Sequence, residues 1–130
     1  MGNRTQTYQF MSTAITSSIV RMGRATLAQL SEVLNAYTAR NTARAVAVWR
    51  KDVDIDEMYN ALFREVVTYM MEDPKMIGAG SQMLFIAKNL ERIGDHATHV
   101  AEMTYYVAEG EPLEAERPRG PRGYGDEAPG

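Results

Sequence analysis

Two pairs of acidic side chains carry the clearest chemical signal in this sequence. Asp52 is followed four residues later by Asp56, and Glu91 is followed four residues later by Asp95. On an α-helix this spacing places both carboxylates of a pair on one face, where their like charges destabilise the helix. A cation bound between them offsets that repulsion, and carboxylate oxygens suit magnesium, calcium, manganese or iron. A solvated acidic face, neutralised by nearby lysine and arginine, is the alternative explanation of the same pattern.

Two further residues extend the second pair. His99 follows Asp95 by one helical turn and offers a nitrogen ligand, and Glu102 adds another carboxylate. A surface or half-buried histidine bonded to a neighbour is the alternative for His99. The Glu-x-x-His motif of di-iron carboxylate bundles is not met by Glu91, because Gly94 stands three residues later. The sequence also has no nucleophile–base motif and no glycine-rich phosphate loop. We therefore expect a metal-binding protein that is not an enzyme.

The composition is that of one ordinary soluble domain. The chain has 130 residues, 45% of them hydrophobic, with 14 Lys+Arg against 17 Asp+Glu and a formal net charge of −3. The absence of cysteine excludes disulfide scaffolds and thiolate zinc sites. The weakly acidic balance lacks the positive footprint of nucleic-acid binders. Residues 1–10 are polar and the apolar runs are short, which indicates neither a signal peptide nor a membrane span, so we expect a cytoplasmic protein.

The chain divides into a helical part, residues 1–110, and a different C-terminal stretch, residues 111–130. Apolar residues at intervals of three and four predict long amphipathic helices over about 11–40, 42–72 and 74–109. Short connections force neighbouring helices antiparallel, so the predicted fold is an all-α, up-down-up three-helix bundle. The C-terminal stretch holds four of the five prolines and few apolar side chains, which predicts a disordered tail.

Local signals mark the helix boundaries. Asn41 is the expected N-cap of the second helix, and Asp73 caps the third, with Pro74 at its first helical position. Gly78 and Gly80 weaken the first turns of the third helix. We therefore expect that helix to become regular only near residue 81.

The apolar stripe of each helix predicts its core face. Glu91, Asp95, Thr98 and Glu102 share one side of the third helix, roughly opposite its stripe, which predicts an acidic ridge on the outer face of the bundle. Asp52 and Asp56 lie near the edge of the second stripe, so that four carboxylates converge on one groove if the second and third helices are neighbours. The first stripe is Ile15, Ile19, Met22, Thr26, Leu30, Val33 and Tyr37, and the third is Ile86, Leu90, Ile93, Ala97, Val100, Thr104 and Val107.

These residues also resemble a known family. The stretch Leu-Glu-Arg-Ile-Gly-Asp-His-Ala-Thr-His-Val-Ala-Glu at 90–102 closely resembles the signature of the PhoU family, bacterial regulators of phosphate transport and phosphate signalling. The segments at 62–74 and 50–56 are similar to the same family. The resemblance covers about residues 20–113, and it is closest to a single C-terminal repeat. His99 departs from the family pattern, which has asparagine there.

The resemblance implies a fold and a function. PhoU proteins have two tandem three-helix bundles whose acidic motifs bind clusters of metal ions, with iron, zinc and manganese as the expected metals here. Carried over, those motifs fall on Asp52, Asp56, Glu91 and Asp95. The family acts as a negative regulator that links the ATPase of the phosphate ABC transporter to a sensor histidine kinase.

The chain has room for one repeat only. A slender bundle of this kind leaves apolar surface poorly covered, so we expect it to pair with a second copy through an isologous interface. The alternatives are a metal-free helical module that binds partner proteins and a truncated remnant of a two-repeat protein.

Overall fold

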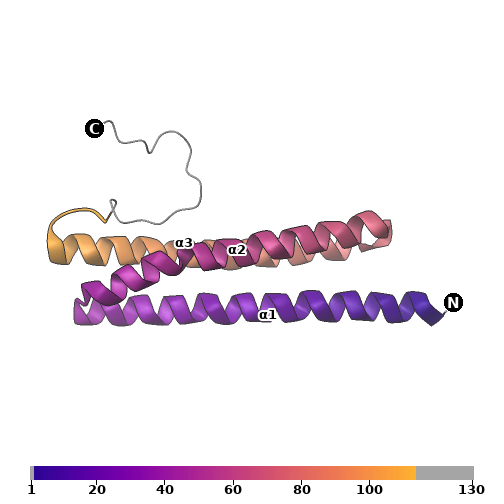
Figure 1. The fold of residues 1–130 in the computed structure, drawn as a ribbon, viewed down its shortest axis with the longest axis horizontal. Coiled ribbons are helices and arrows are strands. Elements are labelled where there is room, and N and C mark those ends of the chain that lie inside the picture. Colours follow the sequence, from indigo (N-terminus) through magenta and orange to yellow (C-terminus); the bar gives the residue numbers. More distant parts are fainter. Residues whose placement is uncertain (1, 114–130) are drawn as a thin grey trace, which may run out of the picture.

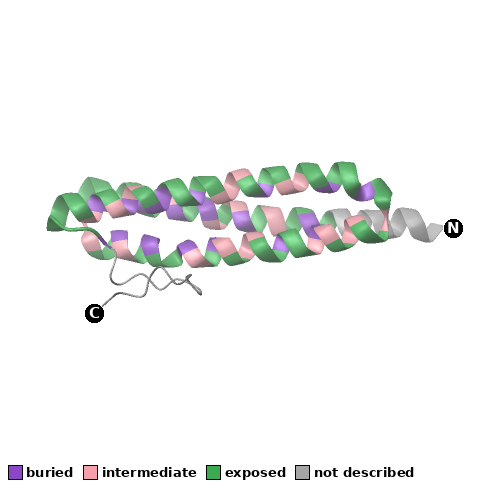
Figure 2. Cartoon of the chain, turned by 90° about the horizontal axis from the view of Figure 1, so that it is seen from above, coloured by how far each residue is buried: buried purple, intermediate pink, exposed green. Residues whose placement is uncertain are grey.

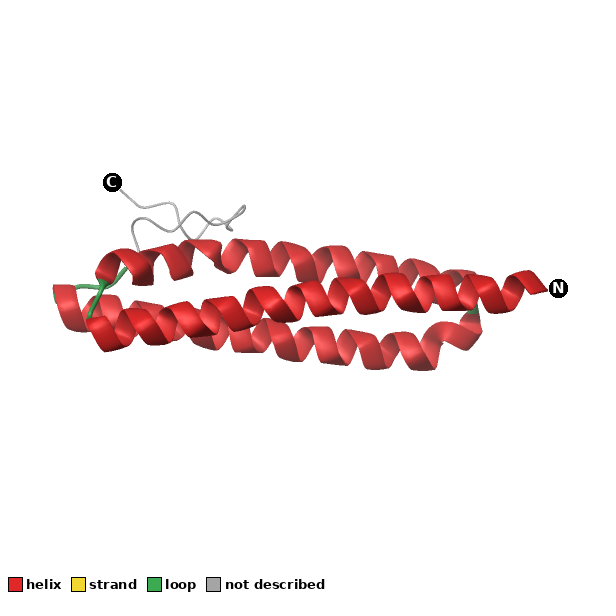
Figure 3. Ribbon diagram, turned by 90° about the horizontal axis from the view of Figure 1, so that it is seen from below, coloured by secondary structure: helices red, strands yellow, loops and turns green. Residues whose placement is uncertain are grey.

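The structure, a computed structural model, describes residues 2–113, with side chains from residue 13 onward. Its elements are α1 (Gly2–Ala39), α2 (Thr42–Glu72), the short 3-10 helix η1 (Pro74–Met76) and α3 (Ile77–Glu109). They form one elongated bundle in which α2 runs antiparallel to α1 and α3 (Figures 1 and 3). The prediction of an all-α three-helix bundle is confirmed. None of the helices in residues 2–113 is both long and apolar enough to cross a membrane.

The first connection is a single tight turn. Arg40 adopts the left-handed conformation with φ of 53°, and the Asn41 amide donates to the Ala36 carbonyl at 2.9 Å. This pattern closes α1 in the manner of a Schellman motif. The Asn41 side chain then accepts from the Arg44 amide at 3.1 Å, as the N-cap prediction requires. With so short a turn, α2 has to fold back along α1.

The helix starts differ from prediction at two places. Helix α1 begins at Gly2, before the predicted start at Met11. Residues 2–10 continue the helical hydrogen bonding of α1, but their sequence has no apolar stripe from which a helix could be predicted. Asp73 caps η1 by accepting from the Lys75 amide at 3.1 Å, and α3 follows directly from Ile77. The expected weak start up to residue 81 was therefore wrong, since Gly80 is a buried packing position.

Buried side chains form two clusters along the bundle axis, visible on the inward faces of the helices in Figure 2. One cluster lies near the α1–α2 turn and surrounds Trp49, which is 1% exposed. The other surrounds Met22 and Ile55 towards the opposite end. Leu113 packs into the Trp49 cluster, so the chain contributes to the core beyond the end of α3. The predicted disorder of 111–130 otherwise falls on residues 114–130, which lie outside the described residues.

The fully buried residues of α3 are small, and only part of the predicted stripe faces the core: Leu90 and Val100 are half-buried and pack against the two clusters. Of the predicted stripe, Ala97 and Thr104 are buried, whereas Ile86, Ile93 and Val107 are 40–57% exposed. Tyr37 of the first stripe is 53% exposed as well. The large buried side chains of the core, such as Trp49, Met22 and Ile55, come from α1 and α2, and α3 contributes small buried residues opposite them. The buried residues of α3 are Gly80, Ala87, Gly94, Ala97, Thr98, Ala101 and Thr104.

Gly94 is one of two glycines, with Gly80, at which α3 packs tightly against α2. A Cβ added there would lie 3.3 Å from Ile55 Cδ1 and 3.4 Å from Ile55 Cγ2, whereas one added at Gly78 would meet nothing within 4 Å. We predict that Gly94→Leu is about 1–3 kcal/mol less stable than Gly78→Leu, because only the first overfills a packed interface. Urea denaturation followed by circular dichroism measures both. Equal stability of the two variants would contradict this account of the α2–α3 contact.

Candidate metal centre

A polar groove runs along the seam between α2 and α3, the two helices that share the most extensive contact. Figure 1 shows these helices lying along each other over most of their length. All six residues predicted as metal ligands line this groove. The lining residues are Asp52, Asp56, Asn60, Lys88, Glu91, Asp95, Thr98, His99 and Glu102.

Three aspartates meet at the centre of the groove. One carboxylate oxygen from each of Asp52, Asp56 and Asp95 lies within 4.8 Å of the others. Their exposure is graded, since Asp52 is buried at 7% exposure, Asp56 is half-buried and Asp95 is exposed. The cluster therefore has a buried floor on α2 and an open side on α3. Three hard oxygen donors at this separation fit a cation such as manganese, iron or zinc.

The cluster perturbs the ionisation of its members. Burial raises the pKa of Asp56 from its ordinary value of 3.8 to about 7, helped by the negative charge of Asp52 and by a hydrogen bond to Glu91. Burial also raises the pKa of Asp95, again with a contribution from Asp52. The charges of His99 and Lys88 act in the opposite direction on Asp95. Without a cation, the groove relieves its crowded negative charge by taking up a proton.

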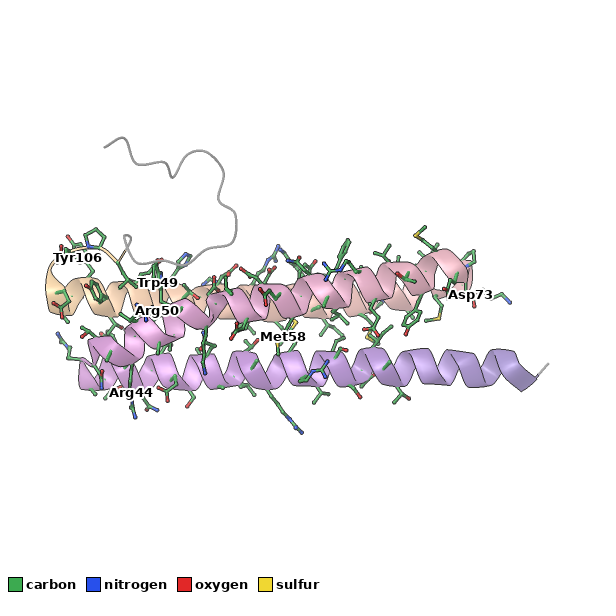
Figure 4. The ribbon with its side chains drawn as sticks, in the orientation of Figure 1. Arg44, Trp49, Arg50, Met58, Asp73 and Tyr106 are labelled. Carbon is green, nitrogen blue, oxygen red and sulfur yellow. The ribbon has the colours of Figure 1, made fainter. Side chains whose placement is uncertain are left out.

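The other carboxylates of the groove are held by neighbouring side chains. Lys88 Nζ donates to Glu91 Oε1 at 2.7 Å, and Trp49 Nε1 donates to Glu102 Oε2 at 2.9 Å. Figure 4 shows Trp49 on α2 towards the end of the bundle where α3 finishes. Glu91 and Glu102 thus flank the three aspartates and do not join their close cluster. His99 also lines the groove outside the cluster, and its ring centroid lies 6.4 Å from that of His96.

The acidic residues lie at the α2–α3 seam and not on the outer face that the sequence predicted. Thr98, on the same side of α3 as Glu91 and Asp95, is 3% exposed. The outer-face prediction was wrong because it centred the core face of α3 too far towards Ile86, Ile93 and Val107, which are exposed. The real core face is rotated towards Gly94 and Thr98. The sequence also predicted that the four carboxylates converge on one groove if α2 and α3 are neighbours. The two helices are neighbours, and the four carboxylates line one groove.

Sequence reasoning gave no place in the site to three residues that line the groove, Asn60, Lys88 and Thr98, or to Trp49, which contacts Glu102. Asn60 follows Asp56 by about one helical turn, and Lys88 precedes Glu91 by about one turn. Their spacing from the predicted ligands was therefore a usable signal. For Trp49 there was no such signal, because its contact with Glu102 joins α2 to α3 across 53 residues.

The fold and the groove define a class: a three-helix bundle whose second and third helices bring carboxylates together in a surface groove. The comparisons with known proteins agree with it. The family model for the PhoU domain matches residues 19–104, and the chain belongs to the PhoU family.

The similar relatives are phosphate-transport accessory proteins by name. The "Phosphate-specific transport system accessory protein PhoU homolog" of Caulobacter vibrioides (strain NA1000 / CB15N) is 52% identical over 106 residues, which is 82% of this chain and 46% of the relative. The homolog of Rhizobium meliloti is 50% identical over 93 residues, 72% of this chain and 39% of the relative. The Escherichia coli K12 protein is 35% identical over 94 residues, with the same two shares. The chain thus spans less than half the length of these curated relatives. No solved structure matches it.

The raised pKa of Asp56 predicts a pH dependence of stability. The folded, metal-free chain binds a proton at Asp56 up to about pH 7, while the unfolded chain releases it near pH 4. The folded state therefore binds more protons between these values, and its stability falls as the pH rises from about 4 to 7. Denaturation in urea at several pH values, with chelator present, measures this slope.

Two variants separate the contribution of the groove from general acid effects. Asp56→Asn is expected to flatten the slope, because the group that takes up the proton is gone. Asp54→Asn, at an exposed position of the same helix, is expected to keep it. A slope unchanged in Asp56→Asn would show that this carboxyl is not the responsible group.

Proposed function

We propose that this protein is a metal-binding, non-enzymatic regulator of phosphate uptake and phosphate signalling. The observation that carries the proposal is the meeting of Asp52, Asp56 and Asp95 in the α2–α3 groove, with carboxylate oxygens within 4.8 Å of one another. The phosphate-transport names of the relatives, which are called accessory proteins and not enzymes, support the regulatory part.

The residues at hand suit the cation that the family implies. Asp52, Asp56 and Asp95 would hold it, with Glu91, His99 and Glu102 bordering the groove for a wider cluster of ions. The bound ion supplies positive charge at the point where the folded chain concentrates negative charge. The aspartates from the two helices would then stay ionised together, and α2 and α3 would be joined at the surface. Iron, zinc and manganese accept this mixture of oxygen and nitrogen donors.

We infer that the regulated partners are the ATPase of the phosphate ABC transporter and a sensor histidine kinase, in the cytoplasm. The support is the phrase "phosphate-specific transport system accessory protein" in the names of the relatives. A metal-joined α2–α3 surface of defined charge is a suitable docking face for such partners. A metal-free interaction module, or a remnant of a longer protein, is the alternative that the metal experiment below decides.

We propose further that two copies of the chain pair along the α1–α3 seam. Gly23 of α1 lies next to Leu90 of α3, since a Cβ there would be 3.9 Å from Leu90 Cδ1. The helical neighbours one turn either side of this contact are large, apolar and 40–66% exposed: Val20, Leu27, Ile86 and Ile93. An exposed apolar strip of this kind is typical of an interface. The chain also spans less than half the length of its relatives, so a second copy would restore a comparable size.

Metal content tests the central proposal. The untagged full chain is purified, analysed for metals, then stripped and titrated with Mn²⁺, Zn²⁺ and Fe²⁺. We expect near-stoichiometric binding that Asp56→Asn and Asp95→Asn each weaken by tenfold or more, while the exposed Asp54→Asn binds as wild type. Trp49 is the single tryptophan and contacts Glu102, so its fluorescence follows the titration. Absence of binding by the wild type would leave the metal-free interaction module.

Sedimentation tests the pairing. Leu27→Glu and Ile93→Glu each place a charge on the α1–α3 seam, and we expect either to convert a dimer to a monomer. Met71→Glu, at a residue that is 78% exposed on α2, is the matched control and is expected to leave the dimer intact. A wild-type chain that sediments as a monomer at high concentration would contradict the pairing.

A further inference from the structure

Thr98 occupies an unusual position among the threonines of the bundle. The hydroxyls of Thr26, Thr38, Thr68 and Thr104 each donate to the carbonyl four residues earlier at 2.8–2.9 Å, as helical threonines commonly do. The Thr98 hydroxyl makes the same local contact with the Gly94 carbonyl at 3.0 Å. It also lies 3.0 Å from Asp52 Oδ1, on the facing helix, so its single hydrogen is shared between the two acceptors.

This second contact depends on the close approach at Gly94. Gly94 has no side chain, and the space a Cβ would take is bounded by Ile55 at 3.3 Å. Helix α3 therefore approaches α2 closely at this level, and Thr98, one turn further along, comes within hydrogen-bond distance of Asp52. Both partners are buried, with Thr98 at 3% and Asp52 at 7% exposure.

We propose that Thr98 is a positioning residue for the metal centre: its hydroxyl holds the buried Asp52 carboxylate in place so that Asp56 and Asp95 complete the site around a fixed ligand. The inference rests on the proposed metal-binding function. Hydrogen bonds from a second layer of residues commonly orient metal-binding carboxylates. A carboxylate has two oxygens with about four acceptor positions, and the Thr98 hydroxyl contacts one of these oxygens, Oδ1. A ligand held before the cation arrives loses little freedom on binding.

The other hydrogen bonds of the groove act elsewhere. Lys88 engages Glu91 and Trp49 engages Glu102, and neither carboxylate belongs to the three-aspartate cluster. Thr98, by contrast, contacts the buried member of that cluster, Asp52, across the two helices, while Asp56 is hydrogen-bonded to Glu91. Thr98 therefore directly contacts one of the proposed metal ligands and can fix its orientation.

The test is Thr98→Val, which removes the hydroxyl and keeps the shape, compared with Thr98→Ser, which keeps the hydroxyl. Stripped full-length protein is titrated with Mn²⁺ by calorimetry, and the bound ion is examined by electron paramagnetic resonance. We expect Thr98→Val to lose about 10- to 100-fold in Mn²⁺ affinity and to change the resonance spectrum. Thr98→Ser is expected to recover affinity close to wild type.

Thr104→Val is the matched control. Thr104 is equally buried on the same helix, and its hydroxyl donates to the Val100 carbonyl, outside the groove. A merely structural effect of losing a buried hydroxyl would lower the free energy of unfolding in both valine variants without touching Mn²⁺ affinity. Equal affinities of Thr98→Val, Thr104→Val and wild type would overturn the proposal.

Two further results are informative. If Thr98→Val does not fold, by circular dichroism, Thr98→Ala replaces it and the same loss of affinity is expected. If the wild type itself binds no Mn²⁺, Zn²⁺ or Fe²⁺, the proposed function fails and the positioning role fails with it. Binding by the wild type together with unchanged binding by the Thr98 variants overturns the positioning role alone.

Discussion

The close packing of α3 against α2 is the constraint on which the rest of this structure depends. Gly94 meets Ile55 so closely that a Cβ would have to displace it, and the neighbouring core positions of α3 are alanine, glycine or threonine. Small residues let two helix backbones come together, and whatever flanks them is then brought together too. In this chain the flanking residues are acids. The same contact that excludes water from the core therefore gathers the negative charges of the groove.

The negative charge gathered in this way determines the chemistry of the groove. The two buried clusters hold α2 and α3 at a fixed distance, so the aspartates cannot separate to relieve their repulsion. Uptake of a proton and binding of a cation are the two remaining ways to neutralise them. Burial of Asp56, together with this crowding of charge, raises its pKa above that of an ordinary aspartate, and the crowding makes the cluster suit a hard cation. The hydrogen bond from Thr98 adds order to the buried end of the cluster.

A second consequence of the narrow core lies on the opposite seam. Because small residues occupy the buried positions of α3, several of its large apolar side chains, among them Ile86 and Ile93, remain exposed. Ile86 and Ile93 of α3 and Val20 and Leu27 of α1 are exposed, and their helical spacing from the Gly23–Leu90 contact places them at the proposed pairing surface. The small buried residues of α3 are thus associated both with the acidic groove between α2 and α3 and with the proposed apolar strip between α1 and α3.

The sequence by itself determined the helices, their number and direction, and the spacing of the candidate ligands. These are local properties: caps at Asn41 and Asp73, turns too short for anything but reversal, and carboxylates one helical turn apart. The PhoU resemblance of residues 90–102 came from the same local pattern. What only the tertiary structure decided is which face of α3 is buried. Hydropathy ranks isoleucine above glycine as a core residue, but close packing of two helices selects for small volume. Compared with the prediction, α3 is therefore turned about its axis, and its acids lie at the α2–α3 seam and not on the outer face. This packing also created the Asp52–Thr98 and Trp49–Glu102 contacts, which join residues too distant in the chain for any periodicity to pair them.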